Sequence, residues 1–346
     1  MRAKSKRRHP RCFVIAEAGS NHNGSMEMAK RLVEVAAEAG ADAVKFQLFK
    51  ANTMYPRVHI NVNYLKRLGV QEGLYDLIKK HEVPREWIPE LAAHCRKTAV
   101  EFMATPFDLE AVRLLNRHVK RFKIATYESF YGDLIRAVMA TGKELILSIG
   151  GTSAAELDEL FQKVLQGYEH QIVIMQCVAK YPAPLETLNL RVLPWIHERY
   201  KVRVGLSDHT EDPLLGPIAA VALNAAVVEK HFTLSKKLPG PDHAFALEPQ
   251  ELKQMVSAIR SVEGLLGATT KELLEAEREL YYYKRCYLLR RSVRSGHRLR
   301  PQDVEILRNT GRQVPFIHPL DPKDVMGRRL QRHKGKGDIL VKGDLG

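Results

Sequence analysis

Short apolar runs recur along the chain, and most of them end in a polar or ionisable residue. Runs of this length that are apolar almost throughout are typical of strands buried on both faces of a parallel sheet. Eight strands are therefore predicted, at residues 13–17, 43–47, 102–105, 122–126, 145–148, 172–177, 204–209 and 227–231.

Amphipathic stretches separate these runs and predict helices. The clearest is 26–39, whose apolar residues recur at helical spacing before Gly40, a typical residue at a helix C-terminus. The other predicted helices are 87–99, 108–117, 134–140, 154–166, 188–199, 213–223 and 249–266. Alternation of eight strands with helices predicts an α/β fold, the (β/α)8 TIM barrel.

One connection, residues 51–83, is much longer than the others. A loop of that length inside a compact barrel usually has a function. It is predicted to lie on the active-site face and to act as a lid.

The pattern changes after Leu266. A helical run at 271–281 precedes short apolar pairs separated by Gly and Pro, which predict a small, turn-rich, β-leaning domain. Its apolar content is low for independent stability, so we expect it to lean on a barrel. The predicted divisions are a basic tail at 1–11, the barrel at 12–268, a linker at 269–284 and the small domain at 285–346.

The composition, 45% hydrophobic over 346 residues, is that of a soluble globular protein. No apolar run reaches the ~20 residues that span a bilayer, and the basic N-terminus lacks the apolar region of a signal peptide. A cytoplasmic protein without a membrane partner is therefore expected. The four cysteines show no metal or redox spacing, which favours buried thiols.

The formal charge of +14 is concentrated at residues 1–11 and 284–300. Such a charge suits anionic partners of any kind. Nucleic acid is disfavoured because the chain has no recognised binding motif and no basic stretch with interleaved aromatic residues. An anionic small-molecule substrate is the better interpretation.

Polar side chains stand at the carboxyl ends of the predicted strands, which meet on one face of a barrel. A single Lys or His there is more often an ordinary hydrogen-bonded residue, but so many together favour a site. Donors of the kind that bind phosphate and carboxylate are Lys45, Thr105, Lys123, Thr126, Ser148 and Ser207.

Two histidines, His209 and His231, close adjacent strands and could share one metal ion. Two neutral nitrogens with a carboxylate and open positions suit Mn²⁺, Zn²⁺ or Fe²⁺, and ordinary hydrogen bonding within the barrel is the alternative. Glu17 and Glu229 are the acid/base candidates.

By these residues the chain closely resembles the sialic acid (N-acetylneuraminate) synthase family. Those proteins condense phosphoenolpyruvate with a hexosamine-type sugar to give a nonulosonic acid and phosphate. The tail from Arg285 resembles their small antifreeze-like (SAF) domain. The matching segments are Ile15-Ala-Glu-Ala-Gly-Ser-Asn-His-Asn-Gly24, Ala41-Asp-Ala-Val-Lys-Phe-Gln47, Ala104-Thr-Pro-Phe107, Gly205-Leu-Ser-Asp-His-Thr210, Glu229-Lys-His-Phe-Thr233 and Gly240-Pro-Asp242.

The resemblance implies roles for individual residues. The six donors above match positions that hold phosphoenolpyruvate. His209 and His231 match the ligands of a divalent metal, usually Mn²⁺ with Mg²⁺ or Co²⁺ possible, which polarises the open-chain sugar aldehyde. Glu17 matches the carboxylate of general acid/base work. Gln47, Tyr181 and Asp242 match positions on the sugar side of the site. Glu128 and Glu229 match further active-site carboxylates.

The resemblance also implies a homodimer. In it, the SAF domain is swapped and inserts Arg308 into the partner subunit's site. The segment 308–312 only approximates the usual turn around that arginine.

Three departures from the family pattern bear on the sugar. Ala179 stands where sialic acid synthases carry Asn, and Thr126 and Ile149 stand where Ser and Thr are common. Segment 240–247 looks more like the pseudaminic acid or spore-coat relatives. The acceptor therefore stays open between N-acetylmannosamine and a diacetamido-hexose.

Two other functions are alternatives to the synthase. One is an aldolase that forms a Schiff base on Lys45 or Lys123. The other is a degenerate barrel whose tail binds glycan, which is disfavoured because Glu17, both histidines and both lysines remain.

Overall fold

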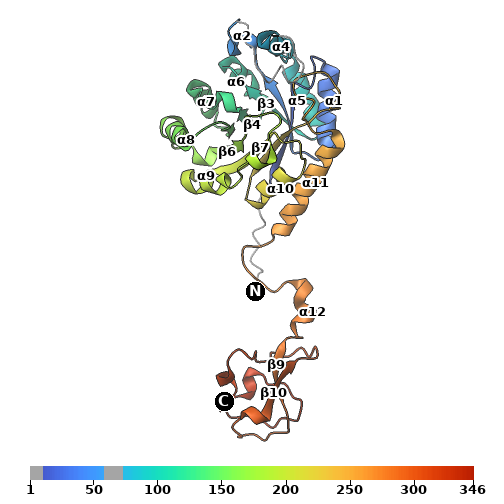
Figure 1. Cartoon of the computed structure of the whole chain (residues 1–346), viewed down its shortest axis with the longest axis vertical. Coiled ribbons are helices and arrows are strands. Elements are labelled where there is room, and N and C mark those ends of the chain that lie inside the picture. The colour runs from blue at the N-terminus through green and yellow to red at the C-terminus, as the bar shows by residue number, and fades with distance from the viewer. Residues whose placement is uncertain (1–10, 58–72) are drawn as a thin grey trace. The chain divides into compact units, whose positions relative to one another are not determined.

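The computed structural model of the chain describes residues 11–57 and 73–346 (Figure 1). These fall into two compact units, the first ending at Ala268 and the second beginning at Thr269. Each unit is described by itself.

Within the described residues, the first unit contains one sheet of eight parallel strands in the order β3-β2-β1-β8-β7-β6-β5-β4. β3 and β4, at the two ends of this order, contact each other, so the sheet is a nearly closed barrel. This confirms the predicted TIM barrel. The strands are β1 Phe13–Gly19, β2 Ala43–Leu48, β3 Glu101–Pro106, β4 Arg121–Ile124, β5 Glu144–Ser148, β6 Ile172–Cys177, β7 Arg203–Asp208 and β8 Val227–His231.

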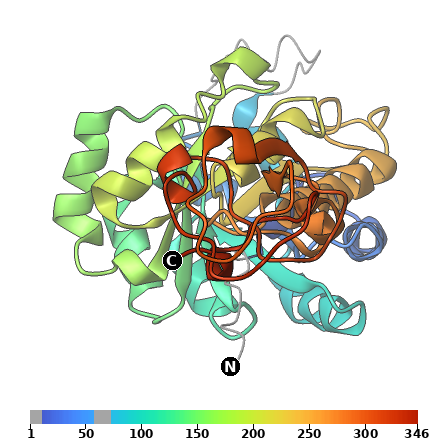
Figure 2. The same ribbon diagram turned by 90° about the horizontal axis from the view of Figure 1, so that it is seen from below.

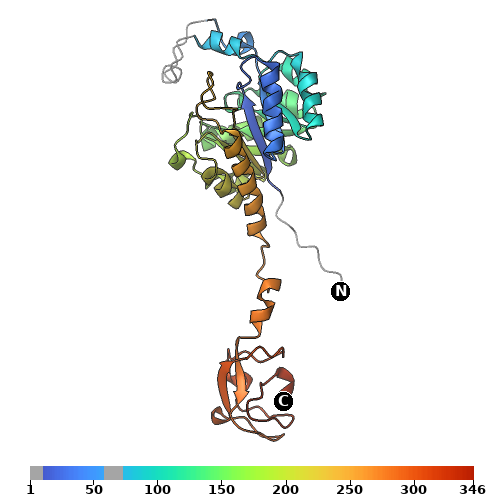
Figure 3. The ribbon, with the colours of Figure 1, turned by 90° about the vertical axis from the view of Figure 1, so that its right-hand side faces the viewer.

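Helices surround this sheet at the periphery of the unit (Figure 2). The first and last of them, α1 and α11, contact each other beside the sheet (Figure 3). The helices are α1 Met26–Glu38, α2 Ala51–Met54, α4 Leu74–Lys80, α5 Trp87–Lys97, α6 Leu109–Leu115, α7 Gly132–Met139, α8 Ala154–Leu160, α9 Val192–Tyr200, α10 Leu215–Ala222 and α11 Pro249–Leu266. In the described part of the chain, none is long and apolar enough to cross a membrane.

Side chains fill the barrel in layers, because successive residues of a strand point to opposite faces of the sheet. The lower layer inside the barrel is apolar and includes Ile15, Ala43, Met103, Ile146 and Val227. Two residues further along each of these five strands, the same face carries a polar residue. The apolar layer thus supports the polar one from below.

Several predicted elements are shorter in the structure. The strand predicted at 122–126 ends at Ile124, because Thr126 begins a short 3-10 helix, Thr126–Glu128. The helix predicted at 188–199 begins only at Val192, since Asn189 adopts a positive φ of 46° that an α-helix cannot accommodate. In the helix predicted at 154–166, α8 gives way after Leu160 to a π-helical turn.

The predicted helix at 271–281 is also wrong over most of its length. The structure has only a 3-10 turn, Glu275–Glu277, followed by the short helix α12, Arg278–Tyr281. The side chains of residues 271–281 are almost all exposed. Without an apolar face to bury, helical propensity alone does not sustain so short a helix.

The second unit is built on an antiparallel pair, β9 Arg285–Leu289 and β10 Val304–Arg308. Isolated bridges such as Leu288 with Ile339 add further pairing. The unit has a hydrophobic core of its own, and whether it also leans on a barrel stays a prediction. That core comprises Tyr287, Leu289, Val293, Leu299, Val304, Ile317, Val325, Leu330 and Leu340.

Two buried aspartates organise the turns of this unit in the same way. Asp303 accepts hydrogen bonds from Arg291 and from the backbone N–H of Arg300. Asp344 pairs with Arg332 and accepts from a backbone N–H in the equivalent turn. In each case the arginine precedes its aspartate by the same number of residues.

Candidate active site

Strand pairing brings the predicted strand-end residues together inside the barrel. Glu17 lies in register with Lys45 on one side and with His231 on the other. Ser207 is likewise in register with Glu229. All five side chains are buried.

Lys45 is held between two carboxylates. Its Nζ lies 2.7 Å from Glu17 Oε2 and 3.7 Å from Glu229 Oε1, and it donates to Thr105 Oγ1 at 3.1 Å. Burial by itself lowers the pKa of Lys45, but Glu17 and Glu229 outweigh it and hold that pKa above its usual value. Lys45 is therefore a fixed ammonium group.

Lys123 lies two strands from Lys45, on the far side of β3, and shares Glu229 with it. It donates to Ser148 Oγ at 2.7 Å and lies 3.6 Å from Glu229 Oε1. Burial lowers the pKa of Lys123, and Glu229 offsets this only in part. Burial raises the pKa of Glu229, but Lys123 and Lys45 outweigh it and hold that pKa below its usual value. Two cations and the hydroxyls of Thr105, Ser148 and Ser207 thus surround one buried region.

Glu17 is oriented by two partners. Gln47 Nε2 donates to its Oε1 at 2.7 Å, while Lys45 contacts its Oε2. The strand bulges directly after Glu17, and Gly19 has a φ of 51°. A Cβ at Gly19 would lie 3.1 Å from Asp242 Oδ2, so a side chain there would crowd the site.

His209 and His231 lie side by side, with ring centroids 5.6 Å apart. His209 Nδ1 donates to the carbonyl of Val178 at 2.8 Å, which leaves Nε2 free to accept. Burial, and then His231, lower the pKa of His209 to about 3, so its ring is neutral. Tyr181 stacks on His209 with centroids 4.1 Å apart.

These two imidazoles fit a divalent metal. His209 has the backbone partner that commonly orients a metal-binding imidazole. His231 has a buried Nδ1 without a hydrogen-bond partner among the described residues. Over residues 11–57 and 73–346, no group of three or more His, Cys, Asp or Glu is placed to hold a metal. The expected carboxylate ligand is therefore not found beside the pair, and the chain would supply two nitrogens.

Thr126 and Glu128 lie beyond the end of β4. Thr126 Oγ1 accepts from the backbone N–H of Gly150 at 3.1 Å, which ties this turn to the end of β5. Burial raises the pKa of Glu128 to about 7, and its Oε2 has no hydrogen-bond partner within the described part of the chain. Arg308 belongs to the second unit, which is described by itself. It lies exposed on β10 of the second unit.

A cavity of about 870 Å³ opens beside this cluster. Ser20 donates to Asp242 Oδ2 at 2.9 Å in its wall. Predicted sugar-side residues line it together with side chains from the described parts of the long connection, 51–57 and 73–83, which confirms that these parts reach the active-site face. Residues 58–72 lie outside the described residues, and the action of the connection as a lid stays a prediction. The lining includes Gln47, Met54, Tyr55, Leu74, Leu77, Ile78, His81, Phe107, Tyr127, Ala179, Tyr181, His231, Pro241 and Asp242.

Sequence reasoning missed the buried pair Lys230 and Asp208. Lys230 Nζ donates to Asp208 Oδ2 at 2.7 Å and to the carbonyl of Thr210 at 2.6 Å. These contacts brace the loop that carries His209. The alternation of side chains along a strand could have predicted this pair. Lys230 lies between Glu229 and His231, so it must point to the other face of the sheet, where it needs a partner.

A TIM barrel with cations, hydroxyls and carboxylates at its strand ends is the architecture of an enzyme that handles an anionic substrate. The NeuB family model matches residues 32–271 of this chain. The chain belongs to the NeuB family, which confirms the resemblance to sialic acid synthases.

Individual relatives agree with this assignment. Spore coat polysaccharide biosynthesis protein SpsE of Bacillus subtilis is 38% identical over 323 residues, covering 89% of this chain and 86% of that protein. N,N'-diacetyllegionaminic acid synthase of Campylobacter jejuni is 37% identical over 289 residues, covering 82% and 86%. The crystal structure of N-acetylneuraminic acid synthetase from Leptospira borgpetersenii, in complex with citrate, matches with a TM-score of 0.70 at 29% identity. That match covers 80% of this chain and 92% of that one.

Proposed function

We propose that this protein condenses phosphoenolpyruvate with the open-chain aldehyde of an N-acetylated amino sugar, giving a nonulosonic acid and phosphate. The observation that carries the proposal is the buried cluster in which Glu17 contacts Lys45 at 2.7 Å beside the large cavity. The lysines of this cluster can bind a small polyanion, and the Glu17 carboxylate is held in a fixed orientation beside them. The adjoining cavity has space for a sugar.

The two substrates take different parts of the site. Lys45, Lys123 and the neighbouring hydroxyls receive the phosphate and carboxylate of phosphoenolpyruvate, because charge-assisted donors bind such anions strongly. Gln47, Tyr181 and Asp242 line the cavity and face the sugar.

The first bond forms between carbon 3 of phosphoenolpyruvate and the sugar aldehyde. A divalent metal, Mn²⁺ by expectation, would be held by His209 and His231 and would stabilise the developing alkoxide. Lys45 and Lys123 hold the enol phosphate in place, and Tyr181, stacked on His209, fixes the sugar side.

Water then adds to carbon 2, and phosphate leaves with the bridging oxygen. Glu17 is the group we propose to accept the proton from that water, because Lys45 and Gln47 hold both of its oxygens in place. The lysines stabilise the departing phosphate.

The Schiff-base alternative requires a neutral lysine amine. Lys45 is held as an ammonium group by two carboxylates. Lys123 is the stronger candidate for that chemistry, since burial lowers its pKa. Borohydride reduction with a keto acid separates the proposals: we expect no covalent adduct, and an adduct on Lys123 would support the aldolase.

For the acceptor, we propose a diacetamido-hexose. A relative that is 37% identical is an N,N'-diacetyllegionaminic acid synthase. Ala179 lines the cavity where sialic acid synthases carry Asn, so this wall offers a methyl group in place of a carboxamide. Such a wall suits the methyl of an additional acetamido group.

A phosphate-release assay with phosphoenolpyruvate and a panel of sugars tests the function. Turnover with a diacetamido-hexose, and weaker turnover with N-acetylmannosamine, is expected. Preference for N-acetylmannosamine would contradict the acceptor assignment. Absence of phosphate release with every amino sugar would contradict the function itself.

Replacing Lys45 or Lys123 with Ala should chiefly weaken phosphoenolpyruvate binding. Each substitution removes a charge-assisted contact of about 1.5–3 kcal/mol, so the KM for phosphoenolpyruvate should rise about tenfold to a hundredfold. Steady-state kinetics measures this, with Lys163→Ala, on an exposed helical ion pair, as the control. A raised KM for the sugar with an unchanged KM for phosphoenolpyruvate would reverse the two subsites.

We further propose a homodimer in which Arg308 of one chain completes the barrel site of the other. The family resemblance is the support for this arrangement, together with the exposure of Arg308 on β10. An isologous dimer then has two such sites.

Mixing Glu17→Gln chains with Arg308→Ala chains tests this arrangement. In a mixed dimer one site carries both substitutions and the other is wild type, so after random exchange about a quarter of all sites should be intact. We expect activity to rise above the average of the two parents. If it stays at that average after exchange is demonstrated, Arg308 acts in its own chain or has no role in the site.

A further inference from the structure

The wall of the cavity includes two short helices, α2 and α4, from the long stretch between β2 and α5. Met54, Tyr55, Leu74, Leu77 and Ile78 contribute their side chains to it. Helices this short do not hold their own position in water. Their placement at the sugar side therefore depends on what fastens them to the barrel.

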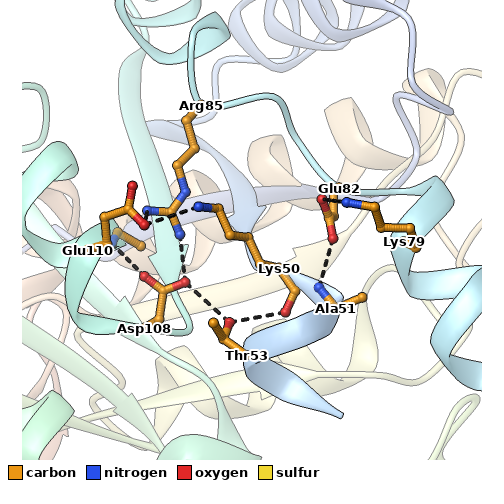
Figure 4. A network of polar contacts seen from close by, with 9 residues as sticks. Lys50, Ala51, Thr53, Lys79, Glu82, Arg85, Asp108 and Glu110 are labelled. Atoms are coloured by element: carbon orange, nitrogen blue, oxygen red, sulfur yellow. Dashed lines mark hydrogen bonds and ion pairs between the residues drawn. The ribbon is translucent and has the colours of Figure 1, made fainter. Parts of the chain in front are cut away.

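Asp108 fastens three elements at once (Figure 4). Its Oδ1 accepts from the backbone N–H of Ala111 at 2.7 Å and caps α6. Its Oδ2 accepts from Arg85 at 2.6 Å and from Thr53 Oγ1 of α2 at 3.4 Å. The cap fixes the carboxylate to the barrel, so Arg85 and Thr53 are positioned against a rigid group.

Arg85 extends this attachment to a second carboxylate. One guanidinium nitrogen contacts Asp108, and another lies 2.9 Å from Glu110 Oε2. Lys50 Nζ donates to the same Glu110 oxygen at 3.0 Å. Lys50 precedes α2 and Arg85 follows α4, so both ends of the stretch are tied to Asp108, in the loop between β3 and α6, and to Glu110, in the first turn of α6 (Figure 4).

Glu82, near the end of the long stretch, is hydrogen-bonded to Ala51 at its beginning. Its Oε1 accepts from the backbone N–H of Ala51 at 2.8 Å, and its Oε2 accepts from Lys79 at 2.9 Å. The side chains of Arg85 and Asp108 are each only 14% exposed. Solvent screens their interaction much less than it screens an ion pair on the surface.

The loop that receives these contacts also belongs to the active site. Phe107, directly before Asp108, lines the cavity and packs edge-to-face on Phe49 with centroids 5.6 Å apart. Thr105, two residues earlier, accepts from Lys45. The same strand end thus carries a phosphate-side residue and the anchor of the sugar-side wall.

We propose that Asp108 and Arg85 are positioning residues for the sugar acceptor, holding α2 and α4 at the cavity wall. This inference rests on the proposed function. The sugar is the affected substrate because α2 and α4 share the cavity with Gln47 and Asp242. Phosphoenolpyruvate binding is spared, because Lys45 and Lys123 are held by partners within the barrel.

Asp108→Asn in the full chain isolates the ion pair, since Asn caps a helix as well as Asp does. We expect the KM for the sugar to rise about tenfold on loss of this charge-assisted contact, and the KM for phosphoenolpyruvate to stay within about twofold. Arg85→Lys keeps the charge but cannot contact both carboxylates, so it should shift the sugar KM in the same direction by a smaller factor.

The control is Asp158→Asn, which breaks another two-contact Arg–Asp pair, a more exposed one between α8 and α9. Arg199 donates to Asp158 there at 2.8 and 2.6 Å. Hydrogen exchange supplies a second measurement that does not need turnover. Amides of 51–57 and 73–81 should exchange faster in Asp108→Asn than in the wild type, and Asp158→Asn should leave them unchanged.

A sugar KM that equals the wild-type value in Asp108→Asn would overturn the inference. So would an equal rise in both KM values, or faster exchange throughout the barrel, because either indicates general destabilisation. Failure of the proposed function is a different result, seen as a wild-type protein that releases no phosphate with any sugar.

Discussion

Glu17→Gln is expected to lower kcat by about two to four orders of magnitude, the range for loss of a general acid–base group. The substitution keeps the size of the side chain and its contact with Gln47 but removes the charge that faces Lys45. Lys45 retains Thr105 and Glu229 as partners, so the KM for phosphoenolpyruvate should change little.

Steady-state kinetics on both substrates measures this effect. Glu101→Gln is a matched control, since Glu101 is a largely buried carboxylate paired with Arg121 at the other end of the barrel. Thermal unfolding of each variant separates loss of chemistry from loss of structure. A kcat within about threefold of wild type would remove Glu17 from the mechanism.

His209→Ala or His231→Ala is expected to abolish turnover. A metal that polarises the aldehyde contributes several kcal/mol to the transition state, which corresponds to at least about a thousandfold in rate. Metal analysis supplies a readout that does not depend on activity. The wild type should retain divalent metal after dialysis, and each variant should lose it.

His197→Ala provides the control, because His197 Nδ1 also bonds a backbone carbonyl, that of Val202, on a helix outside the site. It should keep both metal and turnover. A double variant of His209 and His231 that retains wild-type activity in the presence of a chelator would contradict the metal role.

Much of this site could be predicted from the sequence. In a parallel barrel the apolar runs set the strands, and the first polar residue after each run must lie on the same face of the barrel as its counterparts. Glu17, Lys45, Thr105 and Glu229 follow that rule, and the contact of Glu17 with Lys45 arises directly from register.

Other features depend on side-chain contacts and backbone geometry that the hydrophobic pattern of the sequence does not predict. The attachment of Arg85 to Asp108 joins residues from separate elements through their side-chain ends. The bulge at Gly19 and the early end of β4 at Ile124 follow from local backbone geometry and from the hydrogen bond of Thr126 to Gly150. The missing helix after residue 271 reflects the lack of a buried face.

The central claim is that one active site both joins phosphoenolpyruvate to a sugar and releases phosphate by cleavage of the carbon–oxygen bond. Reaction of uniformly ¹³C-labelled phosphoenolpyruvate with the diacetamido sugar in ¹⁸O-water tests both parts by mass spectrometry. The account predicts a nonulosonic acid that carries all the labelled carbons of phosphoenolpyruvate, and inorganic phosphate without ¹⁸O. Phosphate that contains solvent ¹⁸O, or phosphate released without labelled carbon in the sugar product, would contradict it.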